Sequence, residues 1–71
     1  MMTTKRYEFA LLIEGDSVMS RELEGPHYAD TWNEVIAQAA QANAFYRRFD
    51  RRVTRIDYKD GDGSVESVNF S

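Results

Sequence analysis

Residues 31–50 read TWNEVIAQAAQANAFYRRFD, and this segment predicts the single helix of the chain. Thr31 and Glu34 fit a capping box, in which a hydroxyl and a carboxylate three residues later each accept a hydrogen bond from a free backbone N–H. Apolar residues recur at helical spacing and form one stripe along the predicted helix: Trp32, Val35, Ile36, Ala39, Ala42, Tyr46 and Phe49. Phe45 lies outside this stripe and is expected to be partly exposed.

The segment before the helix predicts a hairpin. Residues 5–14, KRYEFALLIE, alternate in the period of two that is typical of a half-buried strand. Gly15-Asp16-Ser17 is turn chemistry, and a second strand is expected at about 18–24. The residues expected to share the inner face of the first strand are Tyr7, Phe9, Leu11 and Ile13.

The length of the turn sets the register of this hairpin. A slip of one residue exchanges the two faces of a strand, so the register that buries more apolar area is favoured. A three-residue loop at 15–17 is therefore expected, and Gly25-Pro26 is expected to end the pairing, with a loop to about residue 30. The expected pairs are Ile13 with Met19, Leu11 with Arg21, and Phe9 with Leu23.

A second hairpin follows the helix. Residues 52–58 alternate, with Thr54, Ile56 and Tyr58 expected on one face, and DGDG at 60–63 is a strong turn signal. Residues 64–70 are expected to form the second strand of this hairpin, and the favoured register pairs Ile56 with Val68. Residues 1–71 are thus predicted to form a single small α+β domain, ββαββ, with one amphipathic helix packed on a four-stranded, largely antiparallel sheet.

Composition narrows the class of protein. The 71 residues include no cysteine, which excludes disulfides and thiolate zinc sites. A hydrophobic content of 42% excludes the disordered class. No apolar run approaches the roughly 18 residues of a membrane span, and residues 1–6 lead straight into a strand pattern rather than a signal peptide. We expect a cytoplasmic protein without membrane contact.

Charge is sorted along the chain. The net charge is -3, yet residues 35–59 alone carry a net +4. Arginine together with aromatic side chains is how phosphates and unstacked bases are held, so one hypothesis is direct nucleic-acid binding. A second hypothesis is that the cluster binds an anionic protein partner. The remaining interpretation is that these arginines complement the helix dipole and pair with nearby acids. The cluster consists of Arg47, Arg48, Arg51, Arg52 and Arg55.

The first half of the chain is acidic, with a net charge of -4 over residues 1–34. A carboxylate surface on a small rigid fold can imitate the phosphates of DNA and occupy a protein's nucleic-acid groove. The alternative is a solvated face plus charges that favour the start of the helix. The candidate partner-binding acids, called the acidic set below, are Glu14, Asp16, Glu22, Glu24, Asp30 and Glu34.

No motif predicts catalysis, a metal or a cofactor. His27 is the only histidine and is expected in a loop, and one histidine without cysteine cannot build a structural zinc site. The carboxylates of residues 57–66 depart from EF-hand spacing and are interpreted as a hairpin turn. No serine stands in a nucleophile-elbow context.

We therefore expect a protein that binds a macromolecule and performs no chemistry, with monomer and homodimer both open. In size, charge and lack of motifs, the chain resembles small inhibitors encoded by phages or mobile elements, among which are anti-CRISPR proteins. That resemblance implies a protein partner, such as a nucleic-acid-binding complex, blocked by the acidic set. The alternative is direct nucleic-acid binding through the arginine cluster.

Overall fold

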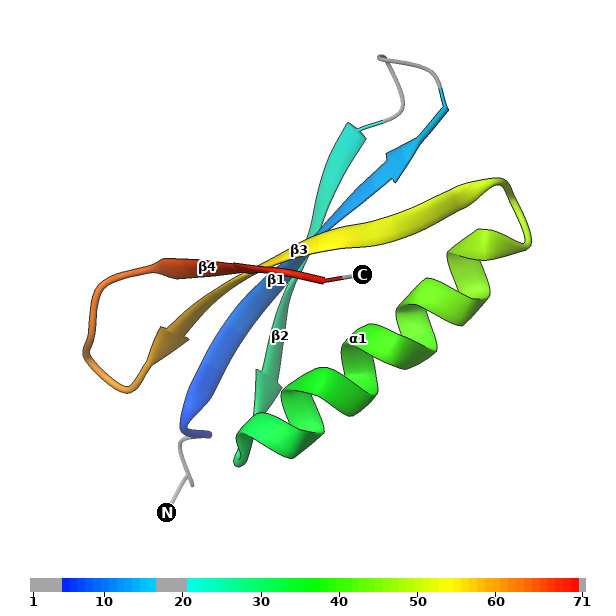
Figure 1. Cartoon of the computed structure of the whole chain (residues 1–71). Coiled ribbons are helices and arrows are strands. Elements are labelled where there is room, and N and C mark those ends of the chain that lie inside the picture. Colours follow the sequence, from blue (N-terminus) through cyan, green and yellow to red (C-terminus); the bar gives the residue numbers. More distant parts are fainter. Residues whose placement is uncertain (1–4, 17–20, 71) are drawn as a thin grey trace.

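The computed structural model describes residues 5–16 and 21–70 and confirms the ββαββ order. The strands form one antiparallel sheet in the order β2-β1-β3-β4, and the helix lies along one face of it (Figure 1). The elements are β1 (Tyr7–Gly15), β2 (Arg21–Ala29), α1 (Trp32–Arg47), β3 (Arg51–Asp60) and β4 (Glu66–Asn69).

The helix begins as its sequence predicts. Thr31 is the N-cap, and its hydroxyl oxygen accepts a hydrogen bond from the Glu34 backbone N–H at 3.2 Å. The helix ends at Arg47 rather than at residue 50, because Asp50 adopts a left-handed conformation with φ of 60° that turns the chain into β3. Phe49 is consequently 59% exposed, and the prediction that it belongs to the core is wrong.

The core lies between α1 and the inner face of the sheet. Strand β1 is central, and its side chains Phe9, Leu11 and Ile13 are no more than 2% exposed. From the helix, Val35 and Ala39 are fully buried against them, while Trp32 packs at the edge. Burial of this order contributes about 1.5–3 kcal/mol for each large apolar side chain, so the β1–α1 contact stabilises the domain.

The register of the first hairpin differs from the prediction. Leu12, rather than Phe9, lies opposite Leu23, and Leu11 lies opposite Glu24. The faces of β2 are therefore exchanged, and Leu23 is 56% exposed instead of inward. The expected partner Met19 and part of the expected turn lie outside the described residues.

The cause lies at the other end of β2, which continues through Gly25-Pro26 to Ala29 instead of stopping there. Pairing of Tyr7 with Ala29 buries Ala29 to 1% exposure, and the ring of His27 lies 5.3 Å from that of Phe9. A register shift absorbs the irregular dipeptide. Only glycine fits here, because its φ is +156° and a Cβ would lie 3.1 Å from Ala10.

Strand β3 contains a bulge that the sequence pattern did not predict. Leu12 pairs with Arg55 and Ile13 with Val53, so Thr54 is the extra residue. Val53 and Ile56 are consequently both buried, and Val53 replaces Thr54 on the inner face. The prediction for Thr54 was wrong because a bulge breaks the period of two.

The second hairpin has the expected register. Ile56 lies opposite Val68, and the backbone N–H of Phe70 donates to the carbonyl of Thr54 at 2.9 Å. Gly61 supplies the positive φ of 61° in the turn between β3 and β4.

The bulge provides a test of the fold. The side-chain oxygen of Asn43 accepts a hydrogen bond from the Val53 N–H at 3.0 Å, which joins α1 to β3. We expect Asn43→Ala to lower the free energy of unfolding by about 1–3 kcal/mol, because a part-buried N–H loses its acceptor. Urea unfolding measures this change. Asn33→Ala, at an exposed position of the same helix, is the control and should change little; equal effects would contradict the assigned role of Asn43.

Candidate functional site

The structure divides the arginine cluster into two groups. Arg51 and Arg55 have intramolecular partners: Arg51 pairs with Glu22 at 2.8 Å, and Arg55 forms two hydrogen bonds with Asp57 at 2.7 and 3.0 Å. The hydrogen bonds with Asp57 raise the pKa of Arg55, and the same contact lowers the pKa of Asp57. These two arginines fit the interpretation in which the cluster serves the fold.

The other three arginines are differently placed. Among the described residues, no carboxylate lies within 4.0 Å of the side-chain nitrogens of Arg47, Arg48 or Arg52. All three are exposed. They are called the free arginines below, and they lie where the chain turns from α1 into β3, at the upper right of Figure 1.

A surface hollow of about 350 Å³ opens at this end of the molecule. Three arginines line it against two aspartates, which leaves a net positive charge; the lining residues are Asp16, Arg47, Asp50, Arg51 and Arg52. The hollow thus brings residues of the acidic first hairpin and of the arginine cluster together. An anionic group entering it would meet guanidinium donors, which bind phosphate and carboxylate through paired N–H groups.

Two exposed phenylalanines lie in the same segment, around the end of α1. The ring centroids of Phe45 and Phe49 are 5.4 Å apart, and their exposures are 52% and 59%. Arg48 lies between them in the sequence. The partial exposure of Phe45 confirms its predicted place off the apolar stripe. Phe49 was missed because the stripe was extended past the true end of the helix.

The acidic set is dispersed over both ends of the molecule and largely paired within it. Glu14 accepts from the hydroxyl of Thr54 at 2.5 Å and lies 3.3 Å from Arg21. Glu22 pairs with Arg51, as given above. Asp16 lines the hollow. Two of the six carboxylates, Asp16 and Glu22, therefore line the hollow or pair with one of its arginines.

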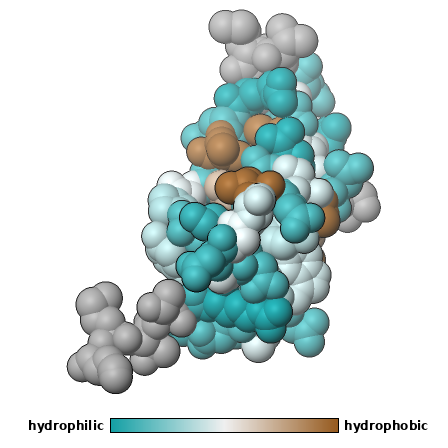
Figure 2. Space-filling model, turned by 90° about the vertical axis from the view of Figure 1, so that its left-hand side faces the viewer, coloured by the Kyte–Doolittle hydropathy of each residue, from teal (hydrophilic) through white to brown (hydrophobic). Residues whose placement is uncertain are grey.

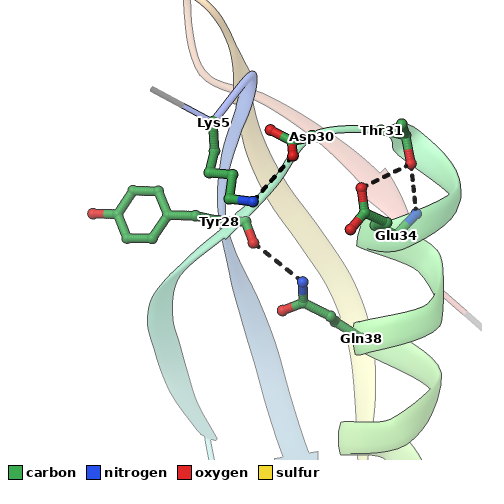
Figure 3. Close-up of polar contacts among 6 residues, drawn as sticks. All are labelled: Lys5, Tyr28, Asp30, Thr31, Glu34 and Gln38. Atoms are coloured by element: carbon green, nitrogen blue, oxygen red, sulfur yellow. Dashed lines mark hydrogen bonds and ion pairs between the residues drawn. The ribbon is translucent and has the colours of Figure 1, made fainter. Parts of the chain in front are cut away.

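Two members of the acidic set lie at the opposite end, where β2 leads into α1 (Figure 3). Asp30 pairs with Lys5 at 3.0 Å, and that contact raises the pKa of Lys5. Glu34 takes part in the capping box, where its side chain accepts from the hydroxyl of Thr31 at 3.3 Å. These carboxylates stabilise the loop and the start of the helix.

The sixth member, Glu24, forms a polar cluster at the seam between β2 and α1. One of its oxygens accepts a hydrogen bond from the hydroxyl of Tyr46, and the other lies 3.0 Å from Nε2 of His27. The Tyr46 contact lowers the pKa of Glu24 and raises the pKa of Tyr46 to about 12. His27 is thus in a strand, and the prediction of a loop histidine is wrong.

Within residues 5–16 and 21–70, no group of three or more His, Cys, Asp or Glu side chains could hold a metal ion. Asp60, from the segment compared with calcium loops, instead accepts two hydrogen bonds from Arg6, at 2.8 and 3.0 Å. The one helix of this part of the chain does not have the length and apolarity needed to cross a bilayer.

Comparison with known protein families, curated protein sequences and solved structures gives no match for this chain.

The Glu24–Tyr46 contact predicts a specific dependence of stability on pH. Below pH 10 the neutral hydroxyl of Tyr46 stabilises the fold, and this contribution is lost as the pH rises towards 12. The ionised Glu24 stabilises above about pH 4.5, and its contribution is lost as the pH falls through its lowered pKa.

We expect Tyr46→Phe to lower the free energy of unfolding by about 1–3 kcal/mol at neutral pH. The difference from the parent should narrow both below pH 4.5 and above pH 10. Chemical unfolding at a series of pH values measures it. Tyr28→Phe is the matched control, because Tyr28 is 52% exposed and points away from the helix (Figure 3). A difference that is constant with pH would contradict the assignment.

Proposed function

We propose that this chain is a binding protein whose partner is single-stranded nucleic acid, held by the free arginines and by the two exposed phenylalanines. The observation that carries the proposal is that three guanidinium groups without a carboxylate partner among the described residues belong to the same part of the chain as two adjacent exposed aromatic rings. Arginines neutralise the phosphates, and aromatic faces stack on unpaired bases. The protein acts by binding and not by catalysis.

The choice of single strands follows from the position of the rings. In a duplex the faces of the bases are stacked on one another, so an aromatic side chain reaches them only where the strands are open. Phe45 and Phe49 present about half of their surface to solvent. A short single strand could therefore place bases on these rings while its phosphates contact Arg48 and Arg52.

A salt titration tests the electrostatic part of this proposal. Fluorescence anisotropy of a labelled 12-nucleotide single strand gives the affinity at each salt concentration. Three phosphate contacts predict a slope of log K against log salt of about -2 for single strands. We expect Arg47→Gln, Arg48→Gln and Arg52→Gln combined to remove most of that slope. Arg6→Gln is the control for lost positive charge, because Arg6 pairs with Asp60 away from the hollow.

The stacking part is tested in the same assay. We expect Phe45→Ala with Phe49→Ala to weaken binding at least tenfold, because each stacked base is worth about 1–3 kcal/mol. Ile36→Ala, which shortens another exposed apolar side chain of α1, should leave binding unchanged. A duplex of the same sequence should bind more weakly than the single strand. If neither the single strand nor the duplex binds at low salt, the proposal is overturned.

A second candidate function is inhibition of a nucleic-acid-binding protein by the acidic set. Its support is that Glu22 and Asp30 are 54% and 50% exposed while being held in place by Arg51 and Lys5. Exposed ion pairs of this kind contribute about 0–1 kcal/mol, so a basic partner could compete for these carboxylates. This is the function implied by the resemblance to phage-encoded inhibitors.

Capture from a lysate depleted of nucleic acid tests the second candidate. We expect a retained protein to be displaced when duplex DNA is added. Asp16→Lys with Asp30→Lys should abolish its capture. The melting temperature should change little, because both residues are exposed and the exposed Asp30–Lys5 pair contributes only about 0–1 kcal/mol. Asp62→Lys reverses an exposed acid outside the set and serves as the control. Capture that survives the double reversal would contradict the acidic-set hypothesis.

A further inference from the structure

The face of the sheet opposite α1 carries no covering layer in the described structure. Leu12 and Leu23 are cross-strand neighbours on this face, and Tyr28 projects from it, away from the helix (Figure 3). Figure 2 looks at the molecule from the side away from the helix and shows exposed hydrophobic residues surrounded by hydrophilic ones. The large exposed side chains of this face are Leu23 at 56%, Tyr28 at 52% and Val65 at 66%.

This face also contains a hollow of about 380 Å³. Small residues, Ala10 and Gly25, form part of its lining, and the larger Leu23, Pro26 and Val65 stand around it. A Cβ on Gly25 would approach Ala10 to 3.1 Å, so β1 and β2 lie close together at this part of the lining. The same surface thus offers both protruding apolar side chains and an apolar recess.

A surface with both protrusions and a recess is suited to a second copy of itself. A twofold interface uses one patch twice, so the patch must be complementary to itself. The charged residues of this patch are also self-complementary. Glu8 and Lys59 are cross-strand neighbours that line the recess. Neither has an ion-pair partner within residues 5–16 and 21–70. A twofold axis can bring Glu8 of each copy to Lys59 of the other.

Pairing through the sheet edges is less favourable than pairing through this face. The edge strands are β2 and β4. Strand β4 has four residues, and β2 contains Pro26, which has no N–H to donate to a neighbouring strand. Both are features that protect edges from adding another strand. The homodimer that the sequence leaves as an alternative to a monomer would therefore not form by strand addition.

We propose that two copies of this chain form a twofold dimer through the uncovered sheet face, with Leu23 and Val65 of each copy packed at the recess of the other. The molecule measures 42 × 21 × 20 Å. The two longer dimensions bound a footprint of about 900 Å², so the broad side is large enough for the roughly 800 Å² that each partner contributes to a standard stable interface. Tyr28 lies at the margin of the contact, with an aromatic surface to bury.

Sedimentation of the whole chain at increasing concentration tests the dimer. We expect the mass to rise from 8.2 kDa towards twice that value. Leu23→Asp and Val65→Asp, each of which places a carboxylate in the apolar contact, should shift the dimer dissociation constant upward at least tenfold. Phe49→Asp is the matched control, because Phe49 is as exposed as Leu23 but lies beyond the end of α1. It should dimerise like the parent.

Far-UV circular dichroism shows whether the aspartate variants fold. If one of them does not, an exchange of the charges at Glu8 and Lys59 tests the dimer instead. We expect Glu8→Lys and Lys59→Glu each to weaken the dimer, and the double variant to restore it. A mass of 8.2 kDa at every concentration would overturn the proposal. So would a dimer that is lost in Phe49→Asp but kept in Leu23→Asp and Val65→Asp. The mass is independent of nucleic-acid binding, so the two proposals fail separately.

Discussion

The single helix covers one face of a four-stranded sheet and so determines which side chains of the central strand can be buried. Phe9, Leu11 and Ile13 of β1 lie under α1 and are almost fully inaccessible. A chain of this size buries only about 60% of its unfolded surface, and within residues 5–16 and 21–70 the other face has no covering element. The bulge in β3 follows from the same demand, because it turns both Val53 and Ile56 towards the helix.

The helix is narrower than the sheet, and polar contacts close the seam towards the edge strand β2. Glu24 accepts a hydrogen bond from the hydroxyl of Tyr46. Arg51 forms an ion pair with Glu22, and its guanidinium lies 5.5 Å from the ring centre of Tyr46. Charges that are separated along the sequence are thus brought together in space, since Glu22 of β2 pairs with Arg51 of β3. The separation into an acidic and a basic half is partly neutralised by folding.

Two surfaces remain outside this internal pairing. The free arginines and exposed phenylalanines gather where α1 turns into β3, and the uncovered apolar recess lies on the far face of the sheet. Because the two surfaces are on different parts of the molecule, a dimer through the sheet face would leave both arginine ends accessible. Two linked sites on one strand would bind more tightly than either alone, through the raised local concentration of the second site.

The sequence determined the features that depend on near neighbours: the capping box at Thr31, the helix that follows it, and the register that places Ile56 opposite Val68. It also located the arginines and predicted the exposure of Phe45. Tertiary structure decided the register of the first hairpin, the exposure of Phe49 and which arginines of the cluster form ion pairs. These depend on how distant segments pack: Ala29 is buried only when β2 continues past Pro26, and Arg51 meets Glu22 only across the folded sheet. Local patterns carry no information about such long-range choices, because the free energy that selects them comes from contacts between elements.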